Sequence, residues 1–144
     1  MNTIAATHVA ELLGIPNVHS ESDLVREIEH GIPSEAYRHL AGLGLTKATL
    51  HAILGPGRTL RRRLAQRQRL TPEESDRAVR LARIFGLAED VFGETEKALR
   101  WLSKPKRHLD PARPGITPWQ LVATEHGARL VEQRLLQIDH GIFA

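Results

Sequence analysis

Apolar residues recur at intervals of three and four along most of the chain, which is the spacing of amphipathic helices. Alternating runs of β-branched residues, which would indicate strands, do not occur. Glycine and proline divide the apolar segments into short units. The pattern therefore predicts an all-α fold. We expect helices at about 4–13, 20–29, 34–41, 47–54, 58–68, 72–86 and 94–102, another that starts at the Thr-Pro pair 117–118, and a last helix from Gly127 to about 140.

The clearest start signal lies at residues 71–74, "TPEE". Thr71 is expected to be the N-cap, Pro72 the first helical residue, and Glu74 the residue that completes a capping box. We expect this helix to end near Gly86. Three further glycines are interpreted as turn or cap residues, namely Gly93, Gly115 and Gly127.

Two tryptophans mark the expected core of the C-terminal part. Trp101 lies with Leu102 at the end of a predicted helix, with Ala98 on the same side. Trp119 lies in the first turn of the helix that follows residues 117–118. We expect both to be core residues, with the indole N–H of Trp119 either exposed or hydrogen-bonded.

Composition limits the class of protein. The chain has 144 residues, 41% of them apolar, 4% aromatic and none of them cysteine. This size fits one domain or two small ones, and the missing cysteines exclude disulfides and thiolate metal sites. We expect a soluble cytoplasmic protein, because neither a signal peptide nor a run of about 20 apolar residues is present. The eight histidines show no zinc-helix spacing, so we expect no metal, no cofactor and no catalysis.

An arginine-rich segment, "RTLRRRLAQRQR", spans residues 58–69 and contains no carboxylate. On a helical wheel Leu60 and Leu64 share one face, and Arg58, Arg62, Gln66 and Arg69 share the opposite one. A solvated surface helix would show the same pattern. Binding to a membrane surface is disfavoured, because the apolar stripe is narrow and lacks aromatic residues.

The residues before this segment favour a DNA-reading unit. Ala52 and Gly55 are small residues that would let two helices cross closely, and a short turn follows, as in a helix-turn-helix. Arginine and glutamine read guanine and adenine edges, and arginine also binds phosphates. The expected base-reading residues are Arg58, Thr59, Arg62 and Gln66, and the expected phosphate contacts are Arg61, Arg63 and Arg69.

The downstream segments "ESDRAVRLARIFGLAEDVFGETEKALRWLSKPKRHLD" and "GITPWQLVATEHGARLVEQRLLQIDHGIFA" resemble the toxin-binding domain of the Xre/MbcA/ParS antitoxin family. The upstream "RTLRRR…RLTPEESDR" is similar to the linking segment of that family, whose middle portion is a Cro-like helix-turn-helix. The resemblance covers about residues 30–144. It divides the chain into an N-terminal helical segment (1–29), a helix-turn-helix domain (30–86) and a C-terminal toxin-binding domain (87–144).

This resemblance implies an antitoxin of a type II toxin–antitoxin system. Such a protein would bind a RES-domain toxin, an enzyme that uses NAD, and would block its active site. It would also repress its own operon by binding operator DNA, and helix-turn-helix proteins usually do so as homodimers. The alternative is a plain repressor without a toxin, which explains the arginine-rich segment but not the match beyond residue 87. A structural helical protein is a third possibility.

The C-terminal end is the expected toxin-binding site. In the last helix Val131, Leu135 and Ile138 form the predicted inward stripe, whereas Leu136 points elsewhere. A short apolar tail follows, which either packs back on the core or enters the toxin's cleft with its carboxylate. The resemblance favours the cleft. The expected toxin contacts are Leu136, His140, Gly141, Ile142, Phe143 and Ala144.

Overall fold

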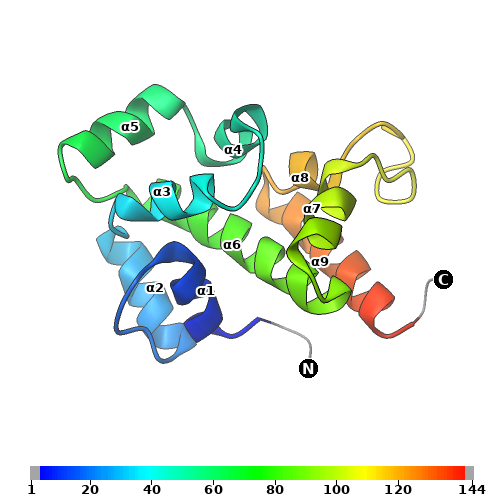
Figure 1. Ribbon diagram of the computed structural model, residues 1–144, viewed down its shortest axis with the longest axis horizontal. Helices are drawn as coiled ribbons and strands as arrows, with labels where there is room; N and C mark the ends of the chain where they lie inside the picture. The colour runs from blue at the N-terminus through cyan, green and yellow to red at the C-terminus, as the bar shows by residue number, and fades with distance from the viewer. Residues whose placement is uncertain (1–3, 142–144) are drawn as a thin grey trace.

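The protein is all-α, as the hydrophobic pattern predicts (Figure 1). The computed structural model describes residues 4–141. Within that range the helices are α1 (Ala6–Leu13), α2 (Glu21–His30), α3 (Glu35–Ala41), α4 (Lys47–Leu54), α5 (Gly57–Ala65), α6 (Pro72–Phe92), α7 (Thr95–Ser103), α8 (Pro118–Leu121) and α9 (Glu125–Asp139).

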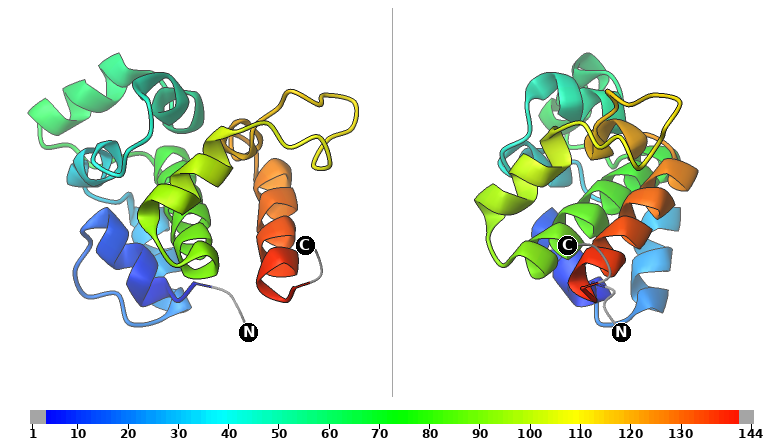
Figure 2. Two further views of the ribbon diagram at one scale, coloured as in Figure 1. Left: turned by 45° about the vertical axis from the view of Figure 1, so that its right-hand side comes forward. Right: turned by 90° about the vertical axis from the view of Figure 1, so that its right-hand side faces the viewer.

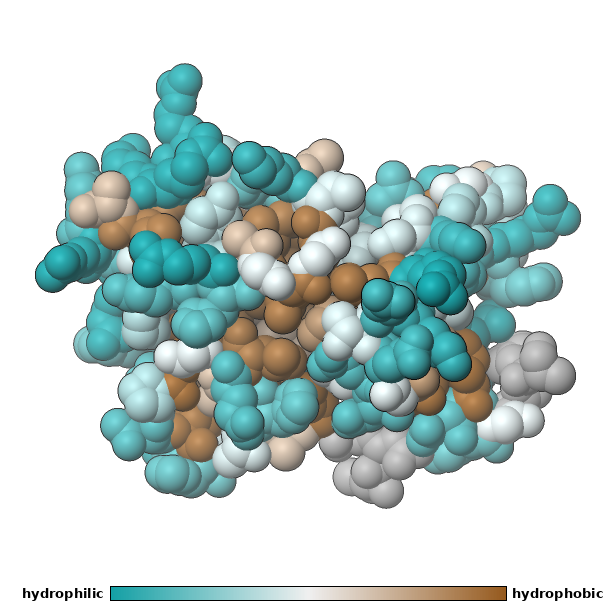
Figure 3. All heavy atoms as spheres, in the orientation of Figure 1, coloured by the Kyte–Doolittle hydropathy of each residue, from teal (hydrophilic) through white to brown (hydrophobic). Residues whose placement is uncertain are grey.

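Helix α6 is the central element of the fold. It packs against α1, α2, α3 and α4 on one side, and against α7 and α9 on the other. Figures 1 and 2 show α6 running through the middle of the molecule, with α1–α4 on the N-terminal side of the fold, α7–α9 on the other, and α5 set apart from α6 beyond α3 and α4. More than half of its residues are buried, including Ser75 and Arg80. The face shown in Figure 3 has its hydrophobic residues gathered at the centre and polar residues around them.

The start of α6 was predicted correctly, but its predicted end was wrong. The Thr71 hydroxyl accepts a hydrogen bond from the Glu74 N–H, and the Glu74 carboxylate accepts one from the Thr71 N–H, which completes the capping box. The helix then continues through Gly86 to Phe92 and ends at Gly93, whose φ is 80°. A Cβ atom on Gly86 would lie 1.9 Å from Ile4 Cδ1. Gly86 is therefore a contact residue beneath α1, not a helix stop.

Trp119 and Gly127, both in the C-terminal core, differ in part from expectation. Trp119 is 2% exposed and belongs to the core, as predicted. Its Nε1, however, is buried without a hydrogen-bond partner among the residues that the structure describes, so the expectation of an exposed or paired N–H was wrong. Gly127 lies inside the first turn of α9 rather than in a turn or cap. A Cβ atom there would lie 1.8 Å from the Leu121 carbonyl oxygen, because α8 and α9 pack closely at this point.

Candidate nucleic-acid and partner-binding surfaces

Helices α4 and α5 are joined by a two-residue turn, as in a helix-turn-helix. The turn starts at Gly55, whose φ of 115° favours glycine. Ala52 is exposed, so the expectation that its small size permits the crossing was wrong. The close approach occurs at Gly57 instead, where a Cβ atom would lie 2.8 Å from His51 Cε1.

The outer face of α5 is strongly basic. Arg58, Arg61 and Arg62 are exposed, and Thr59 beside them is half-buried. Leu60 is buried and anchors the opposite face, as the helical wheel predicted. Gln66 is exposed and lies at the C-cap of α5. Because α5 contains no carboxylate, this face carries positive charge that no acidic residue of the same helix offsets.

The other two predicted DNA contacts, Arg63 and Arg69, both bond to other parts of the protein, although Arg69 is exposed. Arg63 Nε lies 2.7 Å from Glu74 Oε1; this is an ion pair without hydrogen-bond alignment, and both side chains are largely buried. Arg69 lies beyond the end of α5 and donates from Nη1 to the Gly31 carbonyl oxygen at 2.6 Å. Helix α5 ends at Ala65, earlier than expected, and Arg67 follows with a left-handed φ of 54°.

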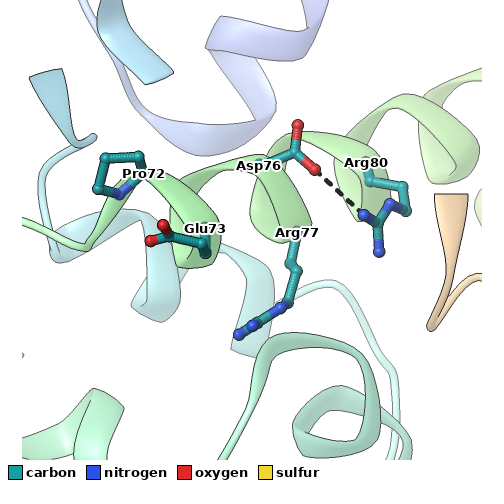
Figure 4. A pocket seen from close by; sticks show the side chains of 5 residues that line it. All are labelled: Pro72, Glu73, Asp76, Arg77 and Arg80. Atoms are coloured by element: carbon teal, nitrogen blue, oxygen red, sulfur yellow. Dashed lines mark hydrogen bonds and ion pairs between the residues drawn. The ribbon is translucent and has the colours of Figure 1, made fainter. Parts of the chain in front are cut away.

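Two residues of α6 hold the helix-turn-helix in place. Arg77 Nη1 donates to the Leu54 carbonyl oxygen at 3.3 Å, at the end of α4. Figure 4 shows this side chain extending away from α6, in the opposite direction from Asp76. Glu74 holds α5 through Arg63. Neither positioning role was predicted: Glu74 was expected only to complete the capping box, and Arg77 appeared only in the "ESDR" of the family resemblance.

A second group of charges joins α6 to the α8–α9 junction. Arg80 Nη2 lies 3.1 Å from Asp76 Oδ2, as drawn in Figure 4, and Arg80 Nε lies 3.2 Å from Glu125 Oε2. Its Nη1 also donates to the carbonyl oxygens of Val122 and Ala123, at 3.4 and 3.2 Å. Arg83 pairs with the same Glu125 at 3.2 Å and with Glu132 at 3.3 Å, so two arginines of α6 join it to the C-terminal helices.

The end of α9 matches the expected inward stripe only in part. Val131 and Leu135 are fully buried, whereas Ile138 is half-buried and lines a surface pocket. Leu136 is also half-buried and packs against the core. Its position off the predicted stripe had indicated a side chain that projects freely from the helix, but the structure shows that it does not.

The remaining predicted toxin contacts lie at the C-terminal limit of the described chain. His140 is exposed, and its N–H donates to the Leu136 carbonyl oxygen. Gly141 has a φ of 72°. The predicted contacts Ile142, Phe143 and Ala144 lie outside the described residues.

The pocket beside α9 has a volume of about 360 Å³. Its apolar lining comes from four helix and loop residues, Phe92, Trp101, Leu109 and Ile138, and its polar lining from Lys106, His108 and Arg134. Trp101 was expected in the core but is half-buried, because it forms a wall of this pocket and packs on Phe92 with ring centroids 5.8 Å apart. Lys106 Nζ lies 5.5 Å from the Trp101 ring centroid. Burial, and to a lesser extent Lys104, lowers the pKa of Lys106.

Within residues 4–141, no three or more histidine, aspartate or glutamate side chains are grouped so that they could hold a metal ion. No helix in the same range is long and apolar enough to cross a membrane.

Comparison with known proteins matches two adjoining regions of the chain. Residues 23–83 match the antitoxin Xre-like helix-turn-helix domain, and residues 87–141 match the antitoxin Xre/MbcA/ParS C-terminal toxin-binding domain. The first match begins within α2, and the two matches meet inside α6. The C-terminal match includes every residue that lines the pocket beside α9.

Individual relatives share most of the chain. An Antitoxin Xre of Pseudomonas putida is 40% identical over 130 residues, which cover 90% of this chain and 79% of that protein. A Prs ADP-ribosylating antitoxin of Sphingobium sp. is 33% identical over 132 residues, covering 87% and 83%. An Antitoxin Xre of Yersinia enterocolitica is 38% identical over 90 residues, covering 62% and 58%. The Pseudomonas similarity extends into residues 1–29, where no family motif was recognised.

Proposed function

Because this chain belongs to the antitoxin Xre family, we propose that it blocks a RES-type toxin and represses its own operon. The observation that carries the proposal is the pair of adjoining matches, one to a helix-turn-helix domain and one to a toxin-binding domain. Both are binding domains rather than catalytic ones. The NAD-using toxin is supported by the family resemblance and by the relative whose name includes ADP-ribosylation, a reaction that uses NAD.

DNA binding is assigned to the exposed face of α5. Arg58 and Arg62 lie one turn apart on this face, with Thr59 beside them, which suits base reading in the major groove. Arg61 is placed for phosphate contact. Arg63 could contact a phosphate only by giving up its ion pair with Glu74. Arg69 is exposed and uses one of its donors on Gly31, so its other N–H groups can still meet a phosphate. A homodimer would present two copies of α5 to a two-fold operator.

Replacing both Arg58 and Arg62 with alanine tests this assignment. Each base-reading arginine should contribute about 1–3 kcal/mol to operator binding, measured by a gel-shift titration over several salt concentrations. Replacing Arg100 and Arg107 with alanine is the matched control, because both are exposed and lie outside the helix-turn-helix. Unchanged operator affinity in the Arg58/Arg62 variant would refute the assignment. A monomeric mass both free and on DNA would refute the dimer.

Toxin binding is assigned to the C-terminal end, with Leu136, His140 and Gly141 at the limit of α9 and residues 142–144 after it. These last residues are Ile142, Phe143 and Ala144, an apolar segment suited to burial in an enzyme's cleft. A segment that fills the substrate site needs no catalytic residue of its own, which agrees with the binding character of the matched domain.

Deleting residues 141–144 tests this part. Gly141 is exposed, and chain ends that carry few internal contacts tolerate truncation, so the fold and operator binding should persist. Protection of cells that express the neighbouring toxin gene should be lost or strongly reduced. A folded truncated chain that protects as well as the full chain would move the binding surface to the helices. The absence of a toxin gene beside this one would favour the plain repressor.

A further inference from the structure

The pocket beside α9 is built from parts of the C-terminal domain that are far apart in sequence. Phe92 comes from the end of α6, Trp101 from α7, Leu109 from the loop that follows, and Ile138 from α9. All four side chains are half-buried and present apolar surface to the pocket, and Phe92, Trp101 and Leu109 also pack against the core. The loop is held in place, since the Lys106 N–H donates to the Ile116 carbonyl oxygen at 3.0 Å.

The charge of the pocket has a single sign. Its ionisable lining residues are Lys106, His108 and Arg134, and none of its lining residues is an aspartate or glutamate. Arg134 Nη2 also contacts the His108 carbonyl oxygen at 3.5 Å, which keeps this side chain beside the loop. Lys106 is partly desolvated, and the lowered pKa agrees with a cation that lacks a nearby carboxylate. The pocket therefore complements an apolar group that carries or adjoins a negative charge.

We propose that this pocket receives an apolar side chain of the toxin and that Lys106 binds an adjacent toxin carboxylate. This contact rests on the proposed function, and it adds a second point of contact between the antitoxin and the toxin beside the C-terminal end. The pocket is continuous with the expected interface, because Ile138 in its wall lies one turn before Gly141. The tail of the antitoxin and the side chain of the toxin would then each enter a cavity of the other protein. Apolar pockets that contain aromatic residues and a desolvated charge are typical of the dominant contacts in protein interfaces.

The test measures binding of the full-length chain to the purified product of the neighbouring toxin gene by titration calorimetry. Lys106→Glu should weaken binding at least about tenfold, because it places two carboxylates against each other. Arg107→Glu makes the same change of charge on the adjacent exposed residue, which does not line the pocket, and should have little effect. Lys106→Met keeps the apolar stem beside Trp101 and should weaken binding less, while reducing its salt dependence.

A second measurement identifies the occupant of the pocket. The chain has two tryptophans, and the indole N–H resonance of Trp101 reports on the pocket wall. It should shift when toxin is added and should not shift when residues 142–144 are removed from the free chain. A shift upon removal would mean that this chain's own end occupies the pocket, and would overturn the proposal.

The outcomes separate the two levels of inference. Toxin binding by the unaltered chain, with equal affinity for Lys106→Glu and Arg107→Glu, would remove the pocket from the interface and leave the proposed function intact. No toxin binding by the unaltered chain would refute the proposed function and the pocket assignment with it. Circular dichroism melts of the variants establish that each is folded, and Lys106→Met serves as the test if Lys106→Glu does not fold.

Discussion

Replacing Arg80 with methionine tests whether this arginine, which bonds to Glu125 and to two carbonyls of the α8–α9 junction, stabilises the fold. Methionine keeps much of the apolar stem but removes every donor. The Arg80 side chain is 10% exposed, whereas its carboxylate partners Asp76 and Glu125 are 54% and 42% exposed. Water can therefore solvate the two carboxylates after the substitution, and each ion pair contributes only about 0.5 kcal/mol.

The hydrogen bonds from Arg80 to two backbone carbonyls contribute more. The Val122 and Ala123 carbonyl oxygens accept these bonds at 3.4 and 3.2 Å, which is long for bonds from a charged donor. A value near 1 kcal/mol each is therefore appropriate rather than the upper range for charged groups. Folding of the variant no longer removes the Arg80 guanidinium from water, and this offsets part of the lost stabilisation. We expect the free energy of unfolding to fall by about 2 kcal/mol.

Urea unfolding followed by tryptophan fluorescence measures this change. Trp119 is buried in α8, next to the carbonyls that Arg80 binds, and should report the loss of local structure. Arg100→Met, at an exposed position of α7, is the control and should change the free energy by less than about 0.5 kcal/mol. Equal unfolding free energies for the two variants would show that the Arg80 contacts contribute nothing net.

Two further substitutions test close contacts elsewhere. Gly127→Ala should destabilise the fold by about 1–3 kcal/mol in thermal melts, because the overlap of the new Cβ with the Leu121 carbonyl exceeds the roughly 1 kcal/mol gained in helix propensity. The control is Gly115→Ala, which has no atom within 4 Å of its Cβ and should be nearly neutral. A Gly127→Ala chain as stable as the original would contradict the close α8–α9 contact. Glu74→Gln keeps a capping oxygen but removes the charge that faces Arg63, so stability should fall by about 1 kcal/mol and operator affinity should fall with an unchanged salt slope. Operator affinity equal to that of the unaltered chain would show that this ion pair does not position α5.

Local chemistry in the sequence determined where helices begin and which faces are apolar. Thr71, Pro72 and Glu74 lie within four residues of one another, so the capping box that they form depends on nothing distant. The inward position of Leu60 followed from helical periodicity in the same way. The order of the helix-turn-helix domain and the toxin-binding domain could also be predicted, because the motifs that carry the family resemblance are themselves segments of sequence.

Contacts between residues distant in sequence decided the rest. Glycine is a residue type that often ends helices, but α6 continues through Gly86 because α1 packs directly over it. The charge of Arg63 suggested a DNA contact, but the fold places Glu74 of α6 against its guanidinium. Trp101 has the hydrophobicity of a core residue, yet the loop after α7 and the end of α9 leave it in the wall of a pocket. Periodicity assigns a side chain to a face of its helix; only the packing of the other helices determines whether that face meets apolar atoms, an opposite charge or solvent.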